Sequence, residues 1–568
     1  MNKIAFAIGA ALCAAGSFGA DLDLNGEWEF RFEEGKALEE VLKPDFAATE
    51  KMSVPGCFDA LAKYRYRRGT GLYRRTFTLE KAVDRAYLVV EGMGLRGEFL
   101  VDGKSLGVHP YPYARLELPT GPLAAGEHTL VAAIDNRLDW KTVKLARVYY
   151  DFYFFGGFYR GVRLAFSDGK VFVRTRDYRT GLVELEYRDG TYDVAFDGGK
   201  SSPVAFANGR ATVKVPDFKL WSPEHPNLHT VTVDGVTTRF GIREVKAADR
   251  RIWLNGEPVF LKGVNRHEQC RETGATTTRE MMTKDLGILK GLGANFVRGA
   301  HYQQDPRFLD LCDEMGFFVW EESLGWGNGQ DYTKLGSTEE LKDPDFIAQQ
   351  IRETGEMVKA SFNHPCVIIA AFLNECGSDK PECKALVDRL VKTIRDLDSG
   401  RLVTFACNHN GGDDLCHENT DLIAFNAYPG TIPANPGTKE ELRRFVEKDF
   451  NGIVKRFRAK YPDKPIMVSE SGCSGFYGMR DETAPFGCED FQNEYLTDIF
   501  ETLWANPDVV GFSIWQFADT VTHQRNCGRW SGRNFGISMA GIVSADRRPK
   551  LSCETVKRFF ARKAAAEE

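Results

Sequence analysis

The feature that most constrains this chain is a series of eight short apolar runs that alternate with amphipathic segments after about residue 245. In one of those segments Leu442, Phe445, Val446 and Ile453 recur at the spacing of one helix face. Eight strand-then-helix units in one series predict a (β/α)8 TIM barrel over residues 245–568. The eight expected strands are 260–268, 294–302, 317–323, 367–375, 402–408, 422–428, 466–472 and 511–517.

The preceding residues have a different texture. Residues 20–167 contain short runs of alternating polarity between Gly, Pro and Asp breaks, for example 73–79 and 128–134, which predicts a jelly-roll β-sandwich. Residues 168–244 continue the pattern in a unit of the size of an immunoglobulin-like β-sandwich. The chain is therefore predicted to be multidomain, with two β-sandwiches before the barrel.

The N-terminus predicts export. Lys3 precedes an apolar stretch of small residues at 4–15, and Ser17 and Gly19 occupy the −3 and −1 positions of a cut after Gly19. This is the pattern of a secretory signal peptide, over residues 1–19, and it predicts a periplasmic or secreted protein. No later stretch is apolar enough to predict a membrane span.

Composition excludes other classes of function. A net charge of −6 over 568 residues, without a basic run, does not suit a nucleic-acid binder. The 13 cysteines include no CxxC pair, and Cys312, Cys366 and Cys407 fall in apolar runs. We expect these three to be buried free thiols rather than disulfide partners.

Polar residues end most of the expected barrel strands, at the edge where TIM barrels build their active sites. Glu375 ends the fourth strand and Glu470 the seventh. Glycoside cleavage needs two carboxyl groups, one to protonate the leaving oxygen and one to attack the sugar or activate water. Either glutamate alone would more often be a solvated loop acid, but the two together at this edge predict a glycosidase.

Five segments, at 220–231, 253–268, 297–322, 362–375 and 465–472, resemble glycoside hydrolase family 2, the β-galactosidase and β-glucuronidase family. The resemblance spans nearly the whole chain after the signal peptide, including the order of the three domains. It implies a retaining exo-β-glycosidase that acts on an oligosaccharide or other glycoside. Members of the family often form dimers or tetramers, so a homo-oligomer is possible.

The resemblance also implies roles for individual residues. Glu375 would be the general acid/base and Glu470 the nucleophile. Asn374 would bind the sugar 2-hydroxyl, and Tyr428 would hold Glu470, with Asn426 beside it. The residues that line the terminal-sugar subsite would be His301 and Trp515, and Asp151 of the first sandwich would either touch the substrate or stabilise its own loop.

Two departures from the family bear on the substrate and on metals. Where glucuronidases carry an Asn-x-Lys pair that grips the sugar carboxylate, this chain has Ser538 and Ala540. A carboxylate needs a cation or several hydrogen-bond donors, so we expect a β-galactosidase-like activity. A β-glucuronidase or β-galacturonidase remains open if Arg525, Arg529 or Arg533 supplies the charge.

The Glu-x-His that holds magnesium in large β-galactosidases is also incomplete, because no histidine follows Glu322 at that spacing. We therefore expect no metal and no cofactor. An inactive carbohydrate-binding relative is the remaining alternative, and the presence of Glu375 and Glu470 together argues against it.

Overall fold

The computed structural model describes residues 21–166, 169–330, 338–431, 438–523 and 536–567. The predicted signal peptide lies outside these residues, so export stays a prediction. No helix among the described residues combines the length and the apolar character that crossing a bilayer requires.

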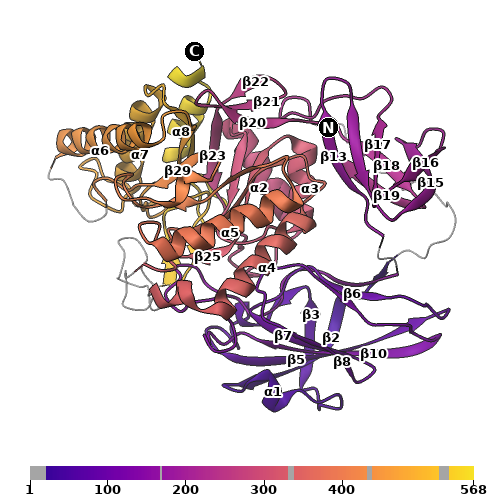
Figure 1. The fold of residues 1–568 in the computed structure, drawn as a ribbon. Coiled ribbons are helices and arrows are strands. Elements are labelled where there is room, and N and C mark those ends of the chain that lie inside the picture. The colour runs from indigo at the N-terminus through magenta and orange to yellow at the C-terminus, as the bar shows by residue number, and fades with distance from the viewer. Residues whose placement is uncertain (1–20, 167–168, 331–337, 432–437, 524–535, 568) are drawn as a thin grey trace, which may run out of the picture.

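The chain begins with a β-sandwich of two antiparallel sheets, drawn in indigo and violet in Figure 1. In sheet order, the six-stranded sheet comprises β3 (Glu50–Val54), β2 (Gly26–Glu34), β5 (Gly69–Leu79), β10 (Gly126–Asp135), β7 (Arg96–Val101) and β8 (Lys104–His109). The four-stranded sheet comprises β1 (Leu22–Asp23), β12 (Val162–Ala165), β6 (Tyr87–Val90) and β9 (Leu116–Pro119). Short elements α1 (Leu38–Val41), β4 (Gly56–Cys57) and β11 (Gly157–Phe158) complete this unit.

A smaller sandwich follows, and it has a hydrophobic core of its own that includes Val183, Leu185 and Val231. One sheet contains β13 (Phe172–Asp177), β14 (Leu182–Glu186) and β17 (Arg210–Lys214). The other contains β16 (Ser202–Phe206), β15 (Gly190–Phe196), β18 (His229–Val233) and β19 (Val236–Phe240). A three-stranded sheet of β20 (Val245–Ala248), β21 (Arg251–Leu254) and β22 (Glu257–Val259) leads into the last unit.

The last unit is the TIM barrel that the sequence predicted. Its parallel sheet runs in the order β27-β26-β25-β24-β23-β31-β30-β29-β28, and only Phe405 separates β27 from β28, so the sheet returns on itself. The strands are β23 (Leu261–Asn265), β24 (Phe296–Gly299), β25 (Phe318–Trp326), β26 (Val367–Asn374), β27 (Leu402–Thr404), β28 (Ala406–Cys407), β29 (Ile423–Asn426), β30 (Ile466–Ser471) and β31 (Val509–Ile514). The helices are α2 (Arg279–Leu292), α3 (Pro306–Met315), α4 (Pro344–Ala360), α5 (Pro381–Leu397), α6 (Lys439–Lys460), α7 (Glu489–Trp504) and α8 (Ser552–Phe560).

Helix α6 differs from its sequence pattern at one position. Thr438 and Glu441 form a reciprocal capping box that starts the helix, and Leu442 and Val446 are buried against the barrel as expected. Phe445, which the pattern assigns to the same face, is instead 38% exposed. Position 445 lies about 100° around the helix from Val446, on the far side of Leu442, so Phe445 stands at the edge of the buried stripe.

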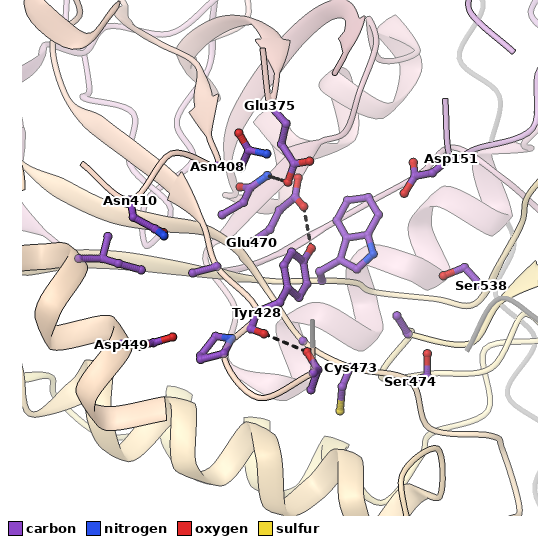
Figure 2. A pocket seen from close by; sticks show the side chains of 18 of the residues that line it. Asp151, Glu375, Asn408, Asn410, Tyr428, Asp449, Glu470, Cys473, Ser474 and Ser538 are labelled. Carbon is purple, nitrogen blue, oxygen red and sulfur yellow. Dashed lines mark hydrogen bonds between the residues drawn. The ribbon is translucent and has the colours of Figure 1, made fainter. Parts of the chain in front are cut away.

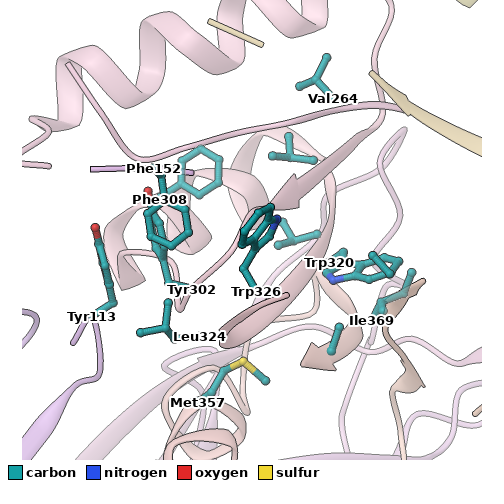
Figure 3. Close-up of a cluster of buried hydrophobic side chains, with 14 of the residues drawn as sticks. Tyr113, Phe152, Val264, Tyr302, Phe308, Trp320, Leu324, Trp326, Met357 and Ile369 are labelled. Atoms are coloured by element: carbon teal, nitrogen blue, oxygen red, sulfur yellow. The ribbon is translucent and has the colours of Figure 1, made fainter. Parts of the chain in front are cut away.

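The first sandwich and the barrel share a dense interface. The ring of Tyr113 stacks on Tyr302 with centroids 3.7 Å apart, and Phe152 packs 5.5 Å from the same ring. Figure 3 shows these sandwich residues beside barrel residues such as Phe308 and Leu324. The contact therefore continues the hydrophobic core from one domain into the other.

A buried ion pair crosses the same interface. Arg160 Nη2 lies 2.7 Å from Glu268 Oε2, and both side chains are 1% exposed. The guanidinium also donates to the carbonyl oxygens of Tyr113 and Gln303, at 2.9 and 2.6 Å. Such pairs depend on both partners, because removing one leaves a buried charge without compensation.

The cysteines agree with the sequence expectation. All 11 that the structure describes are free thiols, and Cys312, Cys366 and Cys407 are buried. Burial raises the pKa of the Cys312 thiol well above its usual value. These thiols therefore act as small core side chains.

Replacing Arg160 by Met should lower the free energy of unfolding by about 3–5 kcal/mol, because Glu268 would keep its charge in a buried position. Guanidinium unfolding followed by tryptophan fluorescence would measure the change. Lys63→Met is the control, since Lys63 pairs with Glu50 at 64% exposure and its loss should leave the midpoint unchanged. Equal midpoints for the two variants would contradict a stabilising role for the interface pair.

Candidate active site

A cavity of about 390 Å³ opens at the carboxyl ends of the barrel strands, where Glu375 and Glu470 face each other (Figure 2). Glu375 follows β26 directly, in a left-handed backbone conformation with φ of 51°. Residues other than glycine adopt this conformation rarely, and where they do so outside ordinary turns they cluster at active sites. Glu470 lies near the end of β30. The strand ends thus bring the two predicted carboxyl groups together.

Glu375 has the environment of an acid that retains its proton. Asn426 Nδ2 donates to Glu375 Oε1 at 2.9 Å. The pKa of Glu375 is raised to about 8, mainly by burial and also by the nearby charges of Glu470 and Asp151, while the Asn426 hydrogen bond and Arg298 oppose the shift. A carboxyl group with this pKa is protonated near neutral pH and can donate to a leaving oxygen.

Glu470 is held by two donors. Tyr428 Oη donates to Oε2 at 2.7 Å, and Arg298 Nη1 donates to Oε1 at 2.6 Å. Hydrogen bonds to a carboxylate from a hydroxyl and a guanidinium fix its orientation. Glu470 therefore has the geometry of a nucleophile, and Tyr428 lies where the sequence resemblance placed it.

Arg298, at the end of β24, organises the floor of the site. It is fully buried and donates to Glu470, to Glu322 at 2.8 Å and to Asn374 Oδ1 at 3.0 Å. No role was assigned to Arg298 from the sequence. The available signal was a charged residue between the apolar runs of a strand, where burial would require a carboxylate partner.

The remaining predicted residues surround this pair. Asn374 accepts hydrogen bonds from Arg298 and Asn426, and its buried Nδ2 has no partner among the described residues. His301 is fixed by Glu322 at 2.9 Å and stacks on Trp515, with centroids 5.3 Å apart. Both His301 and Trp515 line the cavity.

The first sandwich also reaches the cavity. Asp151, which is 6% exposed, lines it together with Ser538 and Ala540. Ser538 and Ala540, which replace the Asn-x-Lys pair, thus lie in the cavity wall but bring no positive charge to it. None of the described residues that line the cavity is Lys or Arg. Arg525, Arg529 and Arg533 lie outside the described residues.

The sequence did not single out several lining residues. Trp326 comes from an extension of β25 beyond the predicted end at residue 323. Asn408, Asn410 and Asp449 line the opposite side from Asp151 and Ser538 (Figure 2). Asn410 and Asp449 lie on a loop and a helix, so no strand ending pointed to them, whereas Asn408 ends the expected strand 402–408 but was given no role.

Two groups of described residues could hold a metal ion, and neither lines the cavity. The ligand atoms of Asp313, His364 and Cys366 lie within 4.8 Å of one another, and so do those of a second group. That second group is Cys407, Asp414 and His417. In both groups the histidine already pairs with the aspartate, at 2.6 and 3.0 Å. Glu322, the acid of the incomplete magnesium motif, pairs with Arg298 and His301.

Comparison with known families matches the barrel to the TIM barrel domain of glycosyl hydrolases family 2 over residues 245–564, which is more than half of the chain. A second model, glycosyl hydrolases family 2, matches residues 163–243. The chain belongs to glycosyl hydrolase family 2. It is therefore a glycosidase by family, as its sequence predicted.

Its relatives resemble it along most of their length. The β-glucuronidase of Canis lupus familiaris is 26% identical over 93% of this chain and 89% of its own. A GH2 β-galacturonidase from Eisenbergiella tayi, solved with galacturonate, is 26% identical with a TM-score of 0.83, covering 95% and 96% of the two chains. A Faecalibacterium prausnitzii β-glucuronidase shares the fold, with a TM-score of 0.84 at 23% identity over 97% and 99% of the chains.

The pKa of Glu375 gives a pH prediction. The acid works only while protonated, so kcat/KM should hold below pH 8 and fall as the pH rises through about 8. Asp151→Asn removes a negative charge that raises this pKa, and the alkaline limb should move to lower pH. A pH–rate profile of each enzyme would measure both effects.

The control is Asp139→Asn, because Asp139 is an acid of the same sandwich that does not line the cavity. Its profile should match that of the unmodified enzyme. An alkaline limb that stays in place in Asp151→Asn would show that Asp151 does not act on Glu375.

Proposed function

We propose that this chain is a retaining, exo-acting β-glycosidase that removes terminal β-linked uronic acids, as a β-glucuronidase or β-galacturonidase. The observation that carries the reaction is the facing pair of Glu375 and Glu470, of which one has a raised pKa and the other is held by two donors. The similarity to the canine β-glucuronidase and to the Eisenbergiella tayi β-galacturonidase supports the class of sugar.

The first chemical step uses both carboxyl groups. Glu470 attacks the anomeric carbon and forms a covalent glycosyl ester, while Glu375 gives its proton to the departing glycosidic oxygen. The C–O bond to the leaving group breaks as the ester bond forms. Arg298 and Tyr428 fix the attacking carboxylate, so little reorganisation is needed at the moment of reaction.

The second step restores the enzyme. Glu375, now deprotonated, takes a proton from water, which attacks the anomeric carbon and displaces Glu470. The sugar leaves with its original β-configuration. The unpartnered Nδ2 of Asn374 is the donor that we assign to the sugar 2-hydroxyl, a contact that strengthens in the transition state.

A neutral β-galactoside is the second candidate, and the wall of the cavity favours it. The described lining contains Asp151 and no Lys or Arg, and Ser538 and Ala540 replace the carboxylate grip. A uronate beside Asp151 and Glu470 needs a compensating cation. That cation would have to come from outside the described residues, where Arg525, Arg529 and Arg533 are the candidates.

We also propose that the enzyme is exported to the periplasm or beyond the cell. The signal-like pattern of residues 1–19 supports this. An exported enzyme of this kind would meet glycosides that are released outside the cytoplasm.

A panel of aryl β-glycosides would test the function: glucuronide, galacturonide, galactoside and glucoside. We expect turnover of a uronide, loss of that turnover in Glu470→Gln, and a loss of about 10²–10⁴-fold in Glu375→Gln. NMR of the first product formed should show the β-anomer. The control is Glu382→Gln, an acid on α5 that lies outside the cavity lining.

Turnover of the galactoside alone would replace the uronide proposal with the second candidate. If a uronide is hydrolysed, single Ala substitutions of Arg525, Arg529 and Arg533 would show which arginine binds the sugar carboxylate. An α-anomer as first product would contradict the retaining mechanism, and no turnover on any glycoside would favour a non-catalytic sugar-binding protein.

A further inference from the structure

The cavity does not end at the two glutamates. It continues past Glu375 to helix α6, where Phe445, Asp449 and Ile453 form part of its lining. These three residues are four apart, so they share one face of the helix. Figure 2 shows Asn410 and Asp449 on the side of Glu375 that is opposite to Asp151 and Ser538.

The two ends of the cavity would hold different parts of the substrate, the terminal sugar and the leaving group. Asp151, Ser538 and Trp515 surround the end that we assign to the terminal sugar. The glycosidic oxygen accepts the proton of Glu375, so the leaving group must extend away from that end. A leaving group that extends in this direction would lie against α6.

Phe445 contributes an aromatic ring to this wall of the cavity. It is 38% exposed, and it makes no ring contact with another described aromatic residue. A sugar ring presents a flat apolar face of C–H groups, which suits stacking on such a ring. Ile453, two turns farther along the same face and 4% exposed, adds an apolar side chain to the wall.

Two polar side chains lie farther along the same wall, Asp449 one turn of α6 after Phe445 and Asn410 on a loop beside the later part of the helix. Asp449, which is half-buried, and Asn410, which is exposed, make no side-chain hydrogen bond with any described residue. The Asn410 loop is held to α6 by Arg456 Nε, which donates to the Asn410 carbonyl at 2.6 Å. The loop and the helix thus form one wall whose side-chain acceptors and donors remain available to a ligand.

We propose that the face of α6 formed by Phe445 and Asp449, with Asn410, is a leaving-group subsite that takes a neutral pyranose. The substrate would then be an oligosaccharide whose terminal sugar is β-linked to another sugar, rather than a conjugate of a small apolar alcohol. The proposal rests on the proposed glycosidase function, and it holds whichever terminal sugar the enzyme removes.

The charges of the wall select among leaving groups. Asp449 and Asn410 offer hydrogen-bond partners that sugar hydroxyls fill and that an alkyl or aryl group leaves without a partner. An anionic leaving group would be repelled by Asp449, because no Lys or Arg lies in the described lining. A neutral polyhydroxylated ring meets both demands.

The test compares two substrates with the same terminal sugar. In one it is β-linked to a neutral pyranose, and in the other to a methyl group that cannot reach α6. Phe445→Ala should lower kcat/KM for the sugar-linked substrate about threefold to tenfold and leave the methyl glycoside within twofold. Asp449→Ala should have a similar selective effect.

Lys448→Ala is the matched control, because Lys448 is exposed on α6 between the two test positions and does not line the cavity. It should change neither substrate. The Kd of each substrate can also be measured by calorimetry in the Glu470→Gln variant, with and without the α6 substitutions. This measurement needs no turnover. If neither substrate is hydrolysed by the unmodified enzyme but the Kd difference persists, the proposed function fails and the subsite stands.

Equal losses for both substrates in Phe445→Ala would show that Phe445 supports the fold and would overturn the subsite. No loss for either substrate would overturn it as well. A phenyl glycoside that loses more kcat/KM than the sugar-linked substrate in Phe445→Ala would show that the wall takes apolar leaving groups, which also contradicts the proposal.

Discussion

The site depends on the buried guanidinium of Arg298. One cation at the end of β24 compensates two carboxylates, those of Glu322 and Glu470, and holds the amide of Asn374. Charges in a barrel interior are tolerated only when they are paired and hydrogen-bonded. Because the partners of Arg298 come from β23, β25, β26 and β30, this single residue links five strands of the barrel.

This arrangement also separates the chemical roles of the two glutamates. Glu470 contacts the cation and a phenol, whereas Glu375 contacts a neutral amide and lies deep enough for burial to raise its pKa. Two residues with the same side chain can therefore serve as acid and nucleophile, because their surroundings differ. The difference arises from which side chains meet inside the barrel, since Arg298 donates to Glu470 whereas Asn426 donates to Glu375.

The sequence predicted the parts of this site that follow from periodicity. Eight apolar runs gave the barrel, and their endings gave Glu375, Glu470 and most of their neighbours. It could not predict the role of Arg298, because the sequence does not show whether a charged residue at a strand end is solvated or paired with a buried carboxylate. Nor could helical periodicity place Phe445, because a 38% exposed ring and a buried one occupy similar positions in the pattern. Contacts between distant segments, such as Asn410 with α6, have no local signal.

The position of Asp151 has a consequence for how the enzyme matures. The residue belongs to a sandwich that is synthesised before the barrel. It nevertheless borders a cavity whose other walls include Trp515, which directly follows the last barrel strand. Domains tend to fold in the order of synthesis, so the sandwich can form while its catalytic loop still lacks the surface against which it packs. The pocket becomes whole only after the last barrel strand and the residues that follow it have been made, and a chain that stops earlier would lack Trp515.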